Sequence, residues 1–469
     1  MRVFDAIRHP RQSTSHFKFG SSHERSCDPR NHHPISKEEI LTQRRSHKWL
    51  AVSATLALGV GLVACGSDNK SSTEETTADT TMTADTTATA DTTVTADTAA
   101  ATTPAAGEPG SVSWEKNFTP WKADATGRSC RAKEGEPLKA AWVYVGPIND
   151  GGWTSAHDRG RQAVADAFGS DVITTYKENV PEGDKVGQVI EDLIADGNTM
   201  IFGTSFGFQD AFVAAAEKHP EVCFEFATGY KSADNLSQFT GAAEDAAWLT
   251  GMAAGAASKT GKLGLLASFP IPEVLRGINA WTLGARAVNP DATVKLIWTN
   301  TWFDPALERK TAEALIAGGA DAIGVVAQDS PASGEAANEK GVFWSGYDSD
   351  QSANFPNVWL SAATYNWGTY EVPRVKAALD GTWVAGNYYG DMADGHIVLA
   401  PLGKTVSAET RALIAEKTKE VVANSGVMFK GPLKDNTGKQ VLGDGEQATY
   451  EQLMSMNFLV EGIDGSIPK

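Results

Sequence analysis

Apolar segments of strand length alternate with helix-like segments from residue 138 onward, and this alternation limits the possible folds more than any other feature of the chain. Runs rich in Val, Ile, Phe and Ala predict strands at residues 139–146, 172–180, 199–206, 222–229, 262–269, 294–300, 321–328, 342–348 and 358–365. Helical spacing of apolar residues appears between them, at residues 156–168, 185–195, 210–218, 246–258, 273–287, 305–317 and 367–379. Strands that alternate with helices form right-handed βαβ units, so the sequence predicts α/β lobes with parallel sheets covered on both faces. Residues 138–469 are enough chain for two such lobes.

Aromatic and polar side chains follow several of the predicted strands. In parallel sheets, ligands bind outside the carboxyl ends of the strands. The candidate ligand-binding residues at these ends are Asp150, Trp153, Thr154, Ser205, Phe206, Phe269, Trp302, Asp329 and Asp348. Aromatic rings stack on the faces of a flat molecule, while carboxylates accept hydrogen bonds from its N–H groups. The pattern therefore predicts a cleft for a small, flat solute with polar edges.

The N-terminal part of the chain carries an export signal. Residues 49–64 read WLAVSATLALGVGLVA, contain no charge and follow Arg44, Arg45 and Lys48. A basic segment before an apolar run that is too short to span a membrane is typical of a signal peptide. The run ends at Cys65 between small residues (LVACGS), as in a bacterial lipobox, where the thiol is acylated, for example with palmitate. We therefore expect residues 1–64 to be leader and signal peptide, and Cys65 to anchor the protein on the extracytoplasmic face of the cell membrane.

A low-complexity segment follows the expected anchor. Residues 65–113 are built largely from Thr, Ala and Asp and contain almost no large apolar side chain, so we expect a disordered linker there. Residues 1–64 carry ten basic and five acidic side chains, and their removal takes the net charge from −17 to −22. A chain this acidic, without a basic stripe, is not expected to bind nucleic acid.

Cysteine and histidine usage gives little sign of metal or redox chemistry. Only Cys130 and Cys223 remain in the folded part, where they form a disulfide or stay separate with Cys223 buried in a strand; the sequence leaves both alternatives open. No cluster of metal ligands and no dinucleotide-binding glycine pattern is present, so we expect no cofactor.

A secreted serine hydrolase is the alternative function. Residues 203–207 read GTSFG, which matches the G-x-S-x-G nucleophile motif between a strand and a helix. Ser205 would be the nucleophile and His396 its base. The motif is short, however, and no HGGG-like oxyanion loop precedes it, so a binding function is favoured over an enzyme.

Specific segments add a family resemblance that covers residues 138–462. They are VGPINDGGWT (145–154), YKENVPEG (176–183), FGTSFGF (202–208), ASFPIPEVLRGINAWTLGA (267–285), WTNTWFDPALE (298–308), GYDSDQ (346–351), YNWG (365–368) and SMNFLVEG (455–462). Together they resemble the basic membrane protein family of ABC-transporter solute receptors, which includes purine nucleoside receptors.

The resemblance implies a type I periplasmic-binding-protein fold, with two Rossmann-like lobes, three hinge crossings and a ligand cleft. We expect the first lobe at residues 114–258 with part of 381–469, and the second at 259–380. The resemblance also implies a monomeric receptor that delivers its solute to an ABC permease driven by an ATPase.

The same resemblance suggests roles for the candidate residues. Asp150 matches an Asp of the family's first motif, Trp153 takes the position of a stacking Phe, and Thr154 replaces an Asn. Asp348 matches a strand-end Asp that bonds the ligand. The nucleoside receptors have a Lys near the position of Tyr365, and this chain has none, so a free purine base such as adenine is expected rather than a nucleoside.

Overall fold

The computed structural model describes residues 107–468. The apolar run, Cys65 and the linker up to residue 106 lie outside the described residues, so the export signal and the lipid anchor stay predictions. Within residues 107–468, no helix is both long and apolar enough to cross a membrane.

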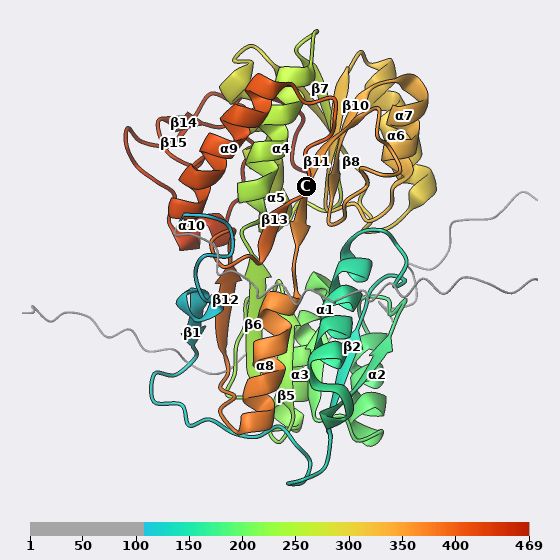
Figure 1. Cartoon of the computed structure of the whole chain (residues 1–469), viewed down its shortest axis with the longest axis vertical. Coiled ribbons are helices and arrows are strands. Elements are labelled where there is room, and N and C mark those ends of the chain that lie inside the picture. Colours follow the sequence, from blue (N-terminus) through green and yellow to red (C-terminus); the bar gives the residue numbers. More distant parts are fainter. Residues whose placement is uncertain (1–106, 469) are drawn as a thin grey trace, which may run out of the picture. The chain divides into compact units, whose positions relative to one another are not determined.

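The first lobe is built on a seven-stranded sheet with the order β1-β12-β6-β5-β4-β2-β3. All its neighbouring strands are parallel except β1, which pairs antiparallel with β12. Its strands are β1 (Phe118–Pro120), β2 (Leu138–Val143), β3 (Val172–Lys177), β4 (Met200–Gly203), β5 (Cys223–Ala227), β6 (Leu236–Gly241) and β12 (Gly386–Gly390). Its helices are α1 (Trp153–Phe168), α2 (Lys185–Ala195), α3 (Gln209–Lys218) and α8 (Gly368–Asp380). Helices α1 and α8 lie side by side although they are far apart in the sequence (Figure 1).

The second lobe has a sheet with the order β13-β11-β10-β9-β7-β8-β16. Its strands are β7 (Lys262–Ala267), β8 (Thr293–Trp298), β9 (Ala322–Val326), β10 (Phe343–Tyr347), β11 (Trp359–Tyr365), β13 (Ile397–Leu399) and β16 (Ile463–Asp464). Its helices are α4 (Ala243–Ala257), α5 (Pro272–Val288), α6 (Pro305–Ala317), α7 (Ala332–Lys340), α9 (Ala408–Ala423) and α10 (Tyr450–Met454). A small hairpin of β14 (Leu433–Lys434) and β15 (Gln440–Leu442) follows α9.

Both sheets share one central strand order. In each, the strand that starts the βαβ series (β2 or β7) lies between the next two strands of that series, as in β3-β2-β4-β5 and β8-β7-β9-β10. The order reverses at β2/β4 and at β7/β9, and such switch points are where ligands bind in open α/β sheets. The predicted α/β class with two parallel-sheet lobes is confirmed.

Within residues 107–468 the chain passes between the lobes three times, and two helices lie in a different lobe from the expected one. The passages follow β6, β11 and β12. Helix α4, which the expected boundary at residue 258 assigned to the first lobe, packs against α5 and β11 of the second. Helices α4 and α5 can approach closely because Gly251 has no side chain. A Cβ at this position would lie only 2.0 Å from the carbonyl oxygen of Trp281. Helix α8, expected in the second lobe, packs against α1 of the first.

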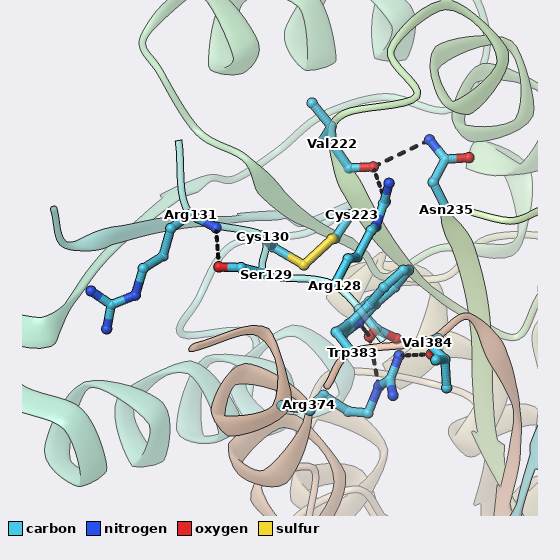
Figure 2. Close-up of a disulfide and its surroundings, with 12 residues drawn as sticks. Arg128, Ser129, Cys130, Arg131, Val222, Cys223, Asn235, Arg374, Trp383 and Val384 are labelled. Atoms are coloured by element: carbon cyan, nitrogen blue, oxygen red, sulfur yellow. Dashed lines mark hydrogen bonds and ion pairs between the residues drawn. A yellow bond between two sulfur atoms is a disulfide. The ribbon is translucent and has the colours of Figure 1, made fainter. Parts of the chain in front are cut away.

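Cys130 and Cys223 form a disulfide (Figure 2), which settles the alternatives that the sequence left open. Their Cα atoms are 6.0 Å apart. The bond joins the segment before β2 to the first residue of β5. Arg128 holds the same segment, because its guanidinium donates to the carbonyl oxygens of Pro220 and Val222 at 2.6 and 3.0 Å.

A buried ion pair connects α8 to the centre of the first sheet. Glu225 on β5 is fully buried and accepts hydrogen bonds from Arg374 Nε at 2.8 Å, Trp383 Nε1 at 2.7 Å and the Tyr370 hydroxyl at 2.7 Å. Arg374 also donates to the Ser237 hydroxyl at 2.9 Å. The carboxylate and guanidinium are therefore desolvated, but each has several polar partners.

We predict that Glu225→Gln lowers the free energy of unfolding by about 3–5 kcal/mol, because it leaves the buried Arg374 charge without a counter-charge. Urea unfolding measures this loss. Asp234→Asn is the matched control, since Asp234 pairs with Lys122 on the exposed surface and should change stability by less than about 1 kcal/mol. Equal effects of the two substitutions would contradict the prediction.

Candidate ligand-binding site

A pocket lies between the two lobes at the carboxyl ends of their strands. We call it the inner pocket; it is lined by Val145, Trp153, Thr204, Ser205, Phe206, Thr228, Ile271, Glu273, Val274, Trp302, Ala327, Asp329 and Tyr347. These residues come from the segments after β2, β4 and β5 in the first lobe and around the ends of β7, β8, β9 and β10 in the second. Its volume is about 30 Å³, room for one or two water molecules. A larger ligand therefore requires the lobes or the lining rings to move apart.

The structure brings together part of the predicted residue set. Trp153, Ser205, Phe206, Trp302 and Asp329 line the inner pocket. The other predicted residues do not line it; they are Asp150, Thr154, Phe269 and Asp348. Asp348 lines a different hollow.

Asp150 holds the first turn of α1 in place. Its carboxylate accepts hydrogen bonds from the backbone N–H groups of Gly152, Thr154 and Ser155 at 2.8, 2.9 and 3.0 Å. Three of the N–H groups that a helix start leaves without partners are satisfied in this way. Burial raises the pKa of Asp150 above its ordinary value, and these backbone hydrogen bonds offset only part of that rise. Asp150 therefore positions Trp153, the first residue of α1.

Trp153 is fixed at its edge. Its indole Nε1 donates to the carbonyl oxygen of Thr204 at 2.6 Å, which joins α1 to the end of β4. Tyr365 and Trp367 contact it edge-on, with ring centroids at 5.5 and 5.2 Å. An indole held in this way can offer its face to a ligand without losing further side-chain entropy.

Glu182 links the two lobes beside the pocket. Its Oε1 accepts hydrogen bonds from the Ser205 hydroxyl at 2.6 Å and the Gly207 N–H at 2.9 Å, both in the first lobe. It also accepts from Trp302 Nε1 of the second lobe at 3.2 Å. Phe269 packs behind Trp302, with ring centroids 4.7 Å apart. Phe269 therefore supports a lining residue instead of lining the pocket.

The same contacts give no support to the hydrolase alternative. Ser205 donates to Glu182 and has no histidine partner among the described residues. His396 packs against Trp367 and Tyr388, and burial lowers its pKa to about 3, too low for a general base near neutral pH.

Asp329 supplies a buried carboxylate to the inner pocket. Burial raises its pKa well above the usual range, and the neighbouring carboxylates of Asp150 and Asp348 raise it further. Glu308 on α6 holds the loop that contains Asp329. Its carboxylate accepts hydrogen bonds from the hydroxyl and the backbone N–H of Ser330 at 2.6 and 3.2 Å. Burial raises the pKa of Glu308 to about 7.

Asp348 is fully buried and lies at the lobe interface. It has a left-handed backbone with φ of 60°, and neither carboxylate oxygen has a hydrogen-bond partner among the described residues. Arg159 of the first lobe donates to its carbonyl oxygen at 3.0 Å. Burial raises its pKa well above the usual range. A buried carboxylate without partners marks a strained position, which is typical of functional regions.

Several lining residues were not predicted from the sequence, notably Thr228, Glu273, Ala327 and Tyr347. Three of them lie at or directly after strand ends, so the rule that identified Trp302 and Asp329 would also have found them. Glu273 does not follow a strand end directly. Its signal in the sequence is that of a helix start, because it is an acidic residue that follows Pro272 in the first turn of α5. It accepts a hydrogen bond from the Tyr365 hydroxyl at 3.1 Å, and burial raises its pKa.

Among the described residues, no group of His, Cys, Asp or Glu side chains is arranged to hold a metal ion. The site instead consists of aromatic rings and carboxylates that two α/β lobes present to a shared pocket. This combination of fold and site is that of a solute-binding protein.

Comparison with known proteins gives the family. Residues 138–428 match the family described as ABC transporter substrate-binding protein PnrA-like, and the chain belongs to this family. It is an ABC transporter substrate-binding protein, which is an extracytoplasmic class with a small-molecule ligand and transporter subunits as partners.

Two curated relatives cover most of the folded part. A purine-binding protein of Brucella abortus is 41% identical over 336 residues, which are 71% of this chain and 95% of the relative. A protein of Haloferax volcanii, whose name proposes glucose binding for an ABC transporter, is 36% identical over 71% of this chain and 82% of its own length. Among solved structures, a solute-binding protein of an ABC transporter system from Aeropyrum pernix has the same fold, with a TM-score of 0.56 at 17% identity over 68% of this chain and 97% of its own.

Close contact of the lobes at Gly152 gives a test of the closed arrangement. A Cβ at this position would lie 2.5 Å from Asp329 Cα and 2.7 Å from its carbonyl oxygen. We therefore expect Gly152→Ala to hold the lobes apart, and small-angle X-ray scattering should report a larger radius of gyration. Gly187→Ala is the control, because a Cβ there meets no atom within 4 Å. Identical scattering curves for both variants and the wild type would contradict this expectation.

The raised pKa of Glu308 predicts a pH dependence of stability. The folded protein keeps the proton of Glu308 up to about pH 7, whereas the unfolded chain releases it near the ordinary value of 4.5. The wild type should therefore lose stability as the pH rises from about 4.5 to about 7, with Glu308 contributing on the order of 3 kcal/mol.

Glu308→Gln stays neutral and should reduce the loss of stability over this pH range, while Asp329 and Asp348, whose pKa values are also raised, still contribute. Urea unfolding between pH 4 and pH 8 measures the difference. Glu313→Gln, at an exposed position on the same helix, should keep the wild-type slope. An unchanged slope in Glu308→Gln would refute the assignment.

Proposed function

We propose that this chain is the lipid-anchored receptor of an ABC importer and binds a purine base such as adenine in the inner pocket. The observation that carries the proposal is that Trp153 and Phe206 of the first lobe line one pocket together with Trp302 and Asp329 of the second. The 41% identity to a protein named as purine-binding supports it.

The side chains of the inner pocket match the chemistry of a purine. Its faces are aromatic and stack on indole or phenyl rings, and such pairs contribute about 0.5–1.5 kcal/mol beyond the area that they bury. Its edge carries N–H donors and ring-nitrogen acceptors. Asp329 and Glu273 are the carboxyl groups that line the pocket, and each accepts from an N–H when ionised or donates to a ring nitrogen when protonated.

The raised pKa of these two carboxyl groups favours such a ligand. A charged carboxylate in a dry pocket is costly without a donor, so an N–H group that enters the pocket replaces the lost hydration. An analogue without the donor leaves the acceptor unpaired, and this difference gives selectivity. Lobe closure over the ligand excludes water and strengthens the same hydrogen bonds.

The small size of the pocket favours a base over a nucleoside. The pocket that Trp153, Phe206 and Trp302 help to line has a volume of only about 30 Å³. A flat ring needs these side chains to separate by its thickness, whereas a ribose demands a wider opening and its own polar contacts. A lysine at the position expected for ribose contact is also missing near Tyr365.

Calorimetric titration of ligand-stripped protein with adenine, guanine, adenosine and glucose tests the proposal. We expect adenine to bind with one-to-one stoichiometry at the inner pocket and glucose to give no heat. Glucose is included because one relative is named for it. Binding of glucose without any purine would refute the proposal.

Asp329→Asn should weaken adenine binding up to about tenfold, because an N–H of the ligand draws the carboxyl group towards its ionised form, which the amide cannot adopt, and a net hydrogen bond contributes about 0.5–1.5 kcal/mol. Asp350→Asn is the matched control, since Asp350 is exposed and lies outside the inner pocket. Its affinity should equal that of the wild type. Equal affinities in both variants would remove Asp329 from the ligand contacts.

The lipid anchor is proposed from the sequence around Cys65, and the receptor is proposed to act as a monomer on the membrane surface. We expect Cys65→Ser to abolish incorporation of an alkyne-tagged fatty acid and to move the protein from the membrane to the soluble fraction. Cys27→Ser should retain both properties. Full labelling of Cys65→Ser would contradict the anchor assignment.

A further inference from the structure

A second and wider hollow lies beside the inner pocket, and we call it the outer groove. Its volume is about 750 Å³, within the range of ordinary small-molecule sites. It shares four wall residues with the inner pocket, namely Phe206, Thr228, Ile271 and Glu273. The outer groove therefore adjoins the inner pocket and, unlike it, has room for a complete small ring without movement of the lobes.

Exposed aromatic side chains surround the outer groove. Trp121, Tyr230 and Tyr450 are 51%, 62% and 39% exposed, and all three line it. They come from the segment after β1, from the loop after β5 and from α10. Among the described residues, the other large hydrophobic side chains with comparable exposure are Ile173 and Val398, which lie elsewhere. Aromatic rings gathered around one hollow indicate an interaction site, whereas scattered ones do not.

Polar side chains with free hydrogen-bonding capacity line the same groove. Gln238 and Thr240 on β6 are more than nine-tenths buried. The Thr240 and Thr228 hydroxyls have no hydrogen-bond partner among the described residues. Buried polar groups normally find a partner, so these groups indicate a ligand with donors and acceptors of its own.

The charged groups of the groove already have partners. Lys231 pairs with Asp210 at 3.2 Å, and Arg276 pairs with Glu244 at 3.2 Å. Glu273 accepts a hydrogen bond from Tyr365. The remaining capacity is neutral, which favours an uncharged ligand over a phosphate or a carboxylate.

We propose that the outer groove is a second binding site, which takes a neutral planar ring with several hydrogen-bonding groups. Trp121 and Tyr230 stack on the ring, while Gln238, Thr240 and Thr228 bond its edge. The use of adenine as the probe rests on the proposed function of the inner pocket, since both sites offer aromatic rings to the faces of a flat molecule and polar groups to its edge. The outer groove is the weaker site because it is open to water and its aromatic side chains are exposed.

The test follows the indole N–H of Trp121 by NMR in full-length protein labelled with ¹⁵N-tryptophan. Loss of one signal in Trp121→Phe assigns it. After the first equivalent of adenine has filled the inner pocket, we expect the Trp121 signal to keep shifting as adenine rises into the millimolar range. Tyr230→Ala should weaken this second phase at least tenfold and leave the first phase unchanged. Ile173→Ala, at a similarly exposed position outside the groove, should change neither phase.

Each outcome separates the two proposals. A Trp121 signal that moves only with the first equivalent reports lobe closure and overturns the second site, while the inner purine site stands. A weak phase that Tyr230→Ala removes, without any stoichiometric phase, supports the outer groove and refutes adenine as the ligand of the inner pocket. A weak phase that Tyr230→Ala leaves unchanged places the binding elsewhere and overturns the proposal.

Discussion

The common direction of the strands within each sheet is the constraint on which the rest of this structure depends. Because the central strands of each sheet are parallel, their carboxyl ends meet at one edge, and the segments that follow them gather there. Thr228, Ala327 and Asp348 directly follow strands and have φ values of 62°, 52° and 60°. Left-handed conformations of such residues cost about 1–3 kcal/mol each, and they persist where the surrounding structure imposes them. In this structure the three residues redirect the chain as it leaves each strand, where the segments that follow meet between the lobes.

The aromatic cluster at the lobe crossings connects the pocket to the hinge. Tyr365, at the end of β11, stacks on Trp367 with centroids 4.6 Å apart, and Trp367 stacks on His157 of α1 at 3.9 Å. Trp153 meets the edges of this stack and also lines the inner pocket. A ligand that moves Trp153 therefore acts directly on side chains at one of the three crossings. Glu182 adds a second connection, since it accepts hydrogen bonds from both lobes.

Periodicity predicted most of the central elements. The bounds of α2 and α6 agree with the predicted ranges, because an N-terminal Pro in α6 and apolar spacing in both are local signals. Strand β6 was missed because its sequence, LSQFTG, contains mostly polar or small residues although every residue is buried. The assignment of α4 and α8 to lobes also failed, since a helix's place in the sequence does not reveal which sheet it packs against.

The sequence by itself determined the α/β class, the family and the residue types at the strand ends, because these depend on local pattern and on motifs. Only the tertiary structure decided what each candidate residue does. Asp150 and Asp329 are both acidic residues in loops after strands, yet one caps α1 and the other faces the inner pocket. The sequence left the disulfide undecided and gave no sign of the Glu182 bridge between the lobes or of the outer groove. Each depends on the distance between segments far apart in the chain, and that distance is set by how the lobes pack.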